Sequence, residues 1–190
     1  MAPLDDLAVS LRAVGDLIAD VPRDQWSART PCAAWNVREL VDHMVLGHRL
    51  FSGILRREAA VEPGALDPES ADVLGGDPAG AYRAAVADLL GAFRQPGVLE
   101  QVWQVPAGSV PGSAAVHLRA VEDLVHGWDL SRATGLELRV PDGLVEPEVE
   151  FARSKLADVP PDRSPFAAPE SVPATAPALD RLAGVLGRAP

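Results

Sequence analysis

The chain has 190 residues, of which 47% are hydrophobic and 23% are charged, and its formal net charge at pH 7 is −10. These values are typical of a soluble globular protein that buries one sizeable core. Nucleic acids and anionic membrane surfaces repel an acidic chain, so the composition argues against both as partners.

Targeting and redox features are sparse. No run of about 18 apolar residues, the length of a membrane span, is present. The N-terminus also lacks the basic start and apolar core of a secretory signal. Cys32 is the single cysteine, which excludes an internal disulfide and fits a reducing compartment. We therefore expect a cytoplasmic protein.

The spacing of apolar residues predicts four long helices. The first covers residues 4–20, the second runs from Asn36 to about Ala59, the third from Asp77 to about Arg94, and the fourth over roughly 112–134. Because long helices joined by shorter links pack antiparallel to one another, this pattern predicts an all-α four-helix bundle.

Local start and stop signals support three of these helices. Asn36, followed three residues later by Glu39, is typical of a capping box. Pro78 directly after Asp77 is suited to the first turn of the third helix. Gly135 follows the fourth helix where a left-handed residue is favoured.

Shorter elements complete the chain. We expect a polar loop over 60–76, a small extended excursion within 98–111, an extended piece with a Pro-Asp-Gly turn over 136–144, and a short helix around 145–157. Residues 158–177 are proline-rich and precede a short closing helix. Residues 1–157 should therefore form the bundle with its short appendage, and residues 158–190 a tail that packs on it.

The four histidines occupy different helix faces. His43 lies in the middle of the apolar stripe of the second helix. Glu122 and His126 are four residues apart in the fourth helix, so they project together beside its apolar stripe. His48 lies roughly 140° around from His43, and His117 about half a turn from His126. Both are expected at the surface or at its boundary.

Three donors on facing helices define a candidate metal site. Two imidazoles and one carboxylate, from His43, Glu122 and His126, suit zinc and also nickel, iron or manganese. Three protein ligands leave positions open for water or substrate, as in reactive sites. The alternative is that Glu122 and His126 form a weak ion pair while His43 is a hydrogen-bonded core residue.

Each of three residues expected near these donors has two possible roles, one functional and one structural. Cys32 precedes a helix N-terminus, which favours a nucleophile, but such cysteines are more often small buried hydrophobes. Trp35 and Trp128 either wall a cofactor pocket or pack the bundle.

Charged residues beside the donors are equally open to interpretation. Arg119 either binds a substrate carboxylate, as a catalytic residue, or pairs with Glu122 one turn later. Asp42 and Asp129 either orient a metal-bound imidazole or solvate the helix surface.

Three segments carry a resemblance to a known family: "TPCAAWNVRELVDHMV" (30–45), "VEDLVHGWDLSRATG" (121–135) and "ALDRLAGVLGR" (178–188). Together they resemble the mycothiol-dependent maleylpyruvate isomerase family of DinB-like proteins. The resemblance implies a bundle that holds a divalent metal, typically zinc, through a histidine of the second helix and the Glu and His of the E-x-x-x-H-x-W-D-L string. These positions fall on His43, Glu122 and His126.

The same resemblance implies a function. We expect a metal-dependent enzyme that uses mycothiol or a similar small thiol for thiol transfer or thiol-assisted isomerisation of a small electrophile, acting as a monomer or homodimer. The alternative is a bundle that binds a metal or small ligand without turnover. The similarity is to the short branch of the family, which lacks the C-terminal α/β domain that contributes an arginine in the founding isomerases.

Overall fold

Helices supply most of the regular structure in the computed structural model, which describes residues 3–70, 72–156 and 166–190. The α-helices within these residues are α1 (Pro3–Ala19), α2 (Val37–Arg56), α3 (Pro78–Phe93), α4 (Gly112–Thr134), α5 (Asp142–Leu156) and α6 (Ala178–Val185). Two short 3₁₀ helices are η1 (Arg23–Gln25) and η2 (Pro68–Ser70), and an antiparallel hairpin pairs β1 (Val102–Val105) with β2 (Gly108–Pro111). The predicted all-α class is confirmed, and the hairpin is the small extended excursion expected within 98–111.

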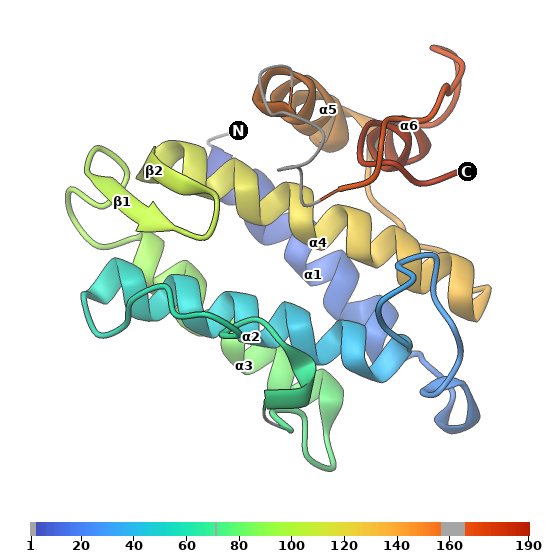
Figure 1. The fold of residues 1–190 in the computed structure, drawn as a ribbon, viewed down its shortest axis with the longest axis horizontal. Coiled ribbons are helices and arrows are strands. Elements are labelled where there is room, and N and C mark those ends of the chain that lie inside the picture. Colours follow the sequence, from blue (N-terminus) through green and yellow to red (C-terminus); the bar gives the residue numbers. More distant parts are fainter. Residues whose placement is uncertain (1–2, 71, 157–165) are drawn as a thin grey trace.

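Four helices form the body of the molecule. α1 packs against α3 and α4, and α2 packs against the same two helices. These contacts close a ring of four helices in cross-section. The hairpin lies at one end of the four helices (Figure 1). α5 and α6 pack on each other and on the outer side of α4. Among the described residues, no helix combines the length and apolar character needed to cross a bilayer.

The ends of α2 show how local sequence positions the helix that carries His43. The Asn36 side chain accepts a hydrogen bond from the Glu39 N–H, and Glu39 accepts one from the Asn36 N–H, which confirms the predicted capping box. α2 ends at Arg56, three residues before the predicted end at Ala59. It stops there because Arg57 adopts a left-handed conformation with φ of 64°.

The Pro-Asp-Gly turn predicted after α4 is wrong. Residues 135–140 have no regular secondary structure, and α5 begins at Asp142, so the tripeptide starts a helix. Pro141 has a fixed φ that is compatible with helix initiation, and Asp142 places negative charge in the first turn, where the helix dipole favours it.

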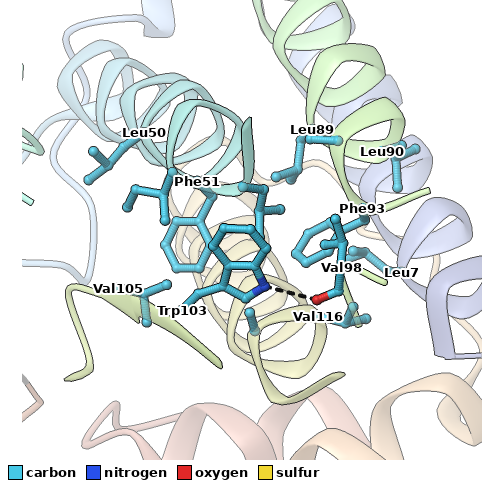
Figure 2. Close-up of a cluster of buried hydrophobic side chains, with 14 of the residues drawn as sticks. Leu7, Leu50, Phe51, Leu89, Leu90, Phe93, Val98, Trp103, Val105 and Val116 are labelled. Atoms are coloured by element: carbon cyan, nitrogen blue, oxygen red, sulfur yellow. Dashed lines mark hydrogen bonds between the residues drawn. The ribbon is translucent and has the colours of Figure 1, made fainter. Parts of the chain in front are cut away.

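A hydrophobic cluster closes the end of the bundle beneath the hairpin. Figure 2 shows Trp103 of β1 inserted among apolar side chains of the four bundle helices, and the cluster includes Leu7, Phe51, Leu89, Phe93 and Val116. The Trp103 indole N–H donates to the Val98 carbonyl over 2.8 Å, so its polar atom is satisfied although the ring is buried. This packing fixes one end of α2 and α4, the two helices that carry the candidate ligands.

The C-terminal residues pack against the outside of α4. Leu182 and Leu186 are buried in a cluster with Val121 of α4 and Val149 of α5. Residues 166–177 carry no helix or strand. Of the predicted proline-rich stretch, residues 158–165 lie outside the described part of the chain.

Candidate metal centre

The three predicted ligands come together where α2 faces α4. His43 Nε2 lies 3.8 Å from Glu122 Oε2, and His126 Nε2 lies 3.4 Å from the same oxygen. One donor atom from each residue falls within 4.8 Å of the other two. Because zinc bonds of about 2.0–2.2 Å at tetrahedral angles separate neighbouring donors by roughly 3.3–3.6 Å, small side-chain shifts suffice to accommodate an ion.

Hydrogen bonds on the far side of each ring orient both imidazoles. His43 Nδ1 lies 2.9 Å from the Leu66 carbonyl oxygen, and His126 Nδ1 lies 3.2 Å from Asp129 Oδ2. Both oxygens are acceptors, so Nδ1 of each ring carries the proton and donates it. The Nε2 atoms of both rings therefore face Glu122, which is the arrangement that metal-ligating histidines require.

The charge state of the site also fits a cation. Burial raises the pKa of Glu122, but the neighbouring His126 and His43 imidazoles outweigh burial and hold that pKa well below its usual range. For His126, burial lowers the pKa, yet hydrogen bonds with Asp129 and Glu122 raise it overall. The Glu122 carboxylate is thus ionised at neutral pH, which suits it to bind a cation.

A second group of possible ligands shares His126 but is a poorer metal site. Cys32, His126 and Asp129 also have donor atoms within 4.8 Å of one another. However, Arg188 already binds Asp129, with Nη2 at 3.0 Å from Oδ2, and its positive charge repels a cation. Burial and then the Asp129 charge raise the pKa of the Cys32 thiol, which disfavours the thiolate needed for coordination or nucleophilic attack.

A cavity of about 660 Å³ opens onto the three ligands, and His43, Glu122 and His126 all line it. Trp35 forms part of the same wall and stacks on His43, with ring centroids 4.2 Å apart. The Thr30 hydroxyl donates to the Trp35 carbonyl over 2.6 Å, which holds the loop before α2 against the site. A small molecule in this cavity would therefore reach the three candidate metal-binding residues, as a reactive site requires.

Trp128 does not share this role. Its indole N–H donates to Asp180 Oδ1 over 2.8 Å, and the Arg132 guanidinium lies over its ring. Trp128 is buried against α6 and is not among the described residues that line the 660 Å³ cavity. Trp128 follows Glu122 by six residues, about 240° of helix rotation, so the two side chains leave α4 in different directions. Of the two alternatives for Trp128, its position favours packing.

Arg119 lines the cavity but does not pair with Glu122 as one reading predicted. Its Nη2 donates to Asp123 Oδ2 over 2.9 Å, and its guanidinium lies over the Phe51 ring, 5.1 Å from the centroid. Its charge is close enough to help lower the pKa of Glu122. The other reading, an anion-binding residue in the cavity, fits this position.

Asp123 is the centre of a buried polar network that the sequence analysis missed. The Tyr82 hydroxyl donates to Asp123 Oδ1 over 2.8 Å, and His48 Nε2 lies 3.1 Å from the same oxygen. His48 is fully buried, so its predicted surface position is wrong. Burial lowers the pKa of His48 more than Asp123 raises it, which keeps the ring neutral. In the sequence, the (i, i+4) spacing of Arg119 and Asp123 was the one indication that these two side chains would form an ion pair.

Three further residues considered in the sequence, Asp42, His117 and Asp129, each contact another part of the chain. Asp42 is buried and accepts a hydrogen bond from the Val73 N–H over 3.1 Å, so it neither orients an imidazole nor solvates the surface. His117 is half-buried, as expected of a boundary residue, and lies 2.9 Å from Glu148 of α5. Asp129 is fully buried and contacts His126, the position expected of an orienting residue.

Comparisons with known proteins agree with this architecture. Residues 7–131 match the family described as the mycothiol maleylpyruvate isomerase N-terminal domain. Crystal structures of the mycothiol-dependent maleylpyruvate isomerase and of a mutant of it share the fold, with a TM-score of 0.63 and 15% and 14% identity. The similarity covers 81% of this chain and 68% of each of those chains. The chain belongs to the mycothiol maleylpyruvate isomerase N-terminal domain family, and its fold is the mostly helical DinB-like bundle.

Two mycobacterial proteins are similar along nearly the whole length. The uncharacterized proteins MT0763 and Rv0738, from two strains of Mycobacterium tuberculosis, are each 33% identical over 181 residues. The similarity covers 93% of this chain and 92% of each relative. Because the similarity leaves only 7% of this chain uncovered, it extends beyond the family match and includes α5.

Proposed function

We propose that this protein is a metal-dependent enzyme that uses a low-molecular-weight thiol of the mycothiol type. The reaction would be thiol transfer to, or thiol-assisted isomerisation of, a small electrophilic substrate. The observation that carries the proposal is the convergence of His43, Glu122 and His126 on one wall of an open cavity. Membership of the mycothiol maleylpyruvate isomerase family supports the choice of thiol.

Zinc is the metal that the donor set fits best. Two imidazole nitrogens and a carboxylate oxygen are ligands found in catalytic zinc sites, with a further position left for an exogenous ligand. A divalent ion at this position supplies Lewis acidity that lowers the pKa of a coordinated thiol, so that a nucleophile exists at neutral pH. Asp129 and the Leu66 carbonyl would hold the two imidazoles in the tautomer that this coordination needs.

Two cavity residues have roles that follow from their positions. Arg119 presents a guanidinium beside Glu122 while Asp123 fixes it from behind, so it would bind an anionic group of the substrate. Trp35 offers an aromatic wall next to His43, against which an unsaturated electrophile would lie flat. Both residues thereby place the electrophile close to the open coordination position.

A thiol-consumption assay tests this proposal. Zinc-loaded protein is mixed with mycothiol and a panel of unsaturated and halogenated electrophiles, and free thiol and substrate spectra are followed over time. Consumption or isomerisation should require both zinc and thiol, and Glu122→Gln should abolish it. His117→Gln is the matched control because His117 lies on the same helix outside the cavity. A zinc-loaded protein that binds mycothiol and turns over none of the electrophiles would instead be a binding module.

A further inference from the structure

We propose that Arg188 is a positioning residue of the metal centre. It acts through Asp129 to hold His126, and it couples the C-terminal segment, residues 166–190, to metal binding. This inference rests on the metal site of the proposed function. It concerns a residue near the end of the chain, 62 positions after the ligand that it would control.

Asp129 forms the bridge between the ligand and the C-terminal segment. Its Oδ2 lies 3.2 Å from His126 Nδ1 and 3.0 Å from Arg188 Nη2, while its Oδ1 lies 3.3 Å from Arg188 Nε. The Asp129 side chain is fully buried, and that of Arg188 is 10% exposed. The guanidinium therefore contacts both carboxylate oxygens and fixes the plane of the carboxylate, which in turn fixes the direction of the His126 ring.

The end of α6 is shaped to deliver Arg188 to this position. Leu186 is buried, and Gly187 turns the chain with φ of 77°. A Cβ on Gly187 would lie 2.6 Å from the Ala167 carbonyl oxygen, so the close approach of these two backbone stretches requires glycine. The Arg188 N–H then donates to the Ala183 carbonyl over 2.9 Å, which ends the helix with the side chain directed at α4.

The same segment also forms part of the cavity wall. Arg188, Gly187 and Ala167 line the 660 Å³ cavity, and so does Phe166, over whose ring the Arg188 guanidinium lies at 5.8 Å. The C-terminal segment therefore contacts the site in two ways. Some of its residues line the cavity, and Arg188 binds Asp129, which contacts His126. Because linkage is reciprocal, metal binding should stabilise the docked segment as much as docking strengthens metal binding.

Arg132 provides a matched control. Arg132 also joins α4 to α6, with Nη2 3.0 Å from Asp180 Oδ1, and it contacts none of the three ligands. Losing Arg132 weakens the same interface without touching Asp129. If Arg188 only holds α6 against α4, Arg188→Gln and Arg132→Gln should change Zn²⁺ affinity to the same extent.

The experiment measures Zn²⁺ affinity by competition with a chromophoric chelator, using the full-length chain. Arg188→Gln and Asp129→Asn should each weaken Zn²⁺ binding by about tenfold or more, the usual effect of removing a partner behind a metal ligand. The double variant should bind no more weakly than Asp129→Asn alone, because Arg188 acts through Asp129. Arg132→Gln should bind Zn²⁺ as the unmodified protein does.

Amide hydrogen exchange of residues 178–188 gives a second readout. Zn²⁺ should slow exchange there in the unmodified protein and in Arg132→Gln, but not in Arg188→Gln. Unchanged Zn²⁺ affinity in Arg188→Gln, or an equal loss in Arg132→Gln, would overturn this inference while leaving the proposed metal site intact. If the unmodified protein binds no Zn²⁺, both the proposed function and the inference about Arg188 are wrong.

Discussion

Gly47 on α2 makes the space that the Arg119 guanidinium of α4 occupies: a Cβ at residue 47 would lie 2.8 Å from Arg119 Nη1. Asp123 holds Arg119 from the other side, so the guanidinium cannot simply move away. Gly47 therefore leaves the space that allows the Arg119 guanidinium to lie beside Glu122.

Gly47→Ala should destabilise the protein. Replacing glycine by alanine inside a helix contributes about 1 kcal/mol of stability. Overpacking a buried site costs about 1–3 kcal/mol, so we expect a net loss of up to about 2 kcal/mol. Urea denaturation measures the difference. Gly91→Ala on α3 is the control, because its Cβ meets nothing closer than 3.8 Å and the substitution should stabilise. A stabilised Gly47→Ala variant would mean that Arg119 is not held in place.

Leu182→Ala tests whether α6 belongs to the cooperative fold. Leu182 is fully buried between α6, α5 and α4, and removing such a side chain costs about 2–5 kcal/mol. The half-buried Val185 on the same helix is the matched control, and its replacement by alanine should cost clearly less. Urea midpoints of the two variants give the comparison. Equal midpoints for Leu182→Ala and the unmodified protein would show that α6 docks too weakly to contribute.

The His117–Glu148 pair should make the docking of α5 pH-dependent. The hydrogen bond that His117 donates to Glu148 raises the pKa of His117 more than burial lowers it. A raised pKa in the folded state means that the stabilisation is complete below the unfolded histidine pKa of about 6.5 and is lost as pH rises through the folded value. Phe151 stacks on the His117 ring, and the charged Lys155 amine lies over the Phe151 ring.

Melting temperatures of the unmodified protein and of His117→Gln at pH 5.5 and pH 8.5 measure this effect. The difference between the two proteins should be larger at pH 5.5, by an amount corresponding to about 1 kcal/mol or less for a partly exposed pair. Using the difference removes the contribution of the other histidines. A larger difference at pH 8.5 would contradict the assigned direction.

Much of the fold was predictable because its signals are local. The capping box at Asn36 and the proline after Asp77 each depend on residues within one turn, and the structure contains both. The pairing of His43 with Glu122 and His126 was also predictable, because helical periodicity places His43 within one apolar stripe and Glu122 and His126 beside another. Facing helices then bring such stripes together.

The rest depended on contacts between distant segments. His48 looked like a boundary residue because it lies off the apolar stripe of α2. That helix packs on both α3 and α4, so its buried face is wide enough to include His48 beside Asp123. Nothing in the order of residues indicates that Arg188 would meet Asp129 or that the Leu66 carbonyl would meet His43. Such partners are set by how the loops and the chain end return to the bundle.

Metal content of the purified and Zn²⁺-reloaded protein tests the central claim most directly. Elemental analysis should find one Zn²⁺ per chain in the unmodified protein and in His117→Gln, whose histidine lies outside the site. His43→Ala, Glu122→Gln and His126→Ala should each lose most of the metal, since two remaining ligands hold zinc poorly. If these three variants retain the metal content of the unmodified protein, or if that protein holds none after reloading, the proposed metal centre is wrong.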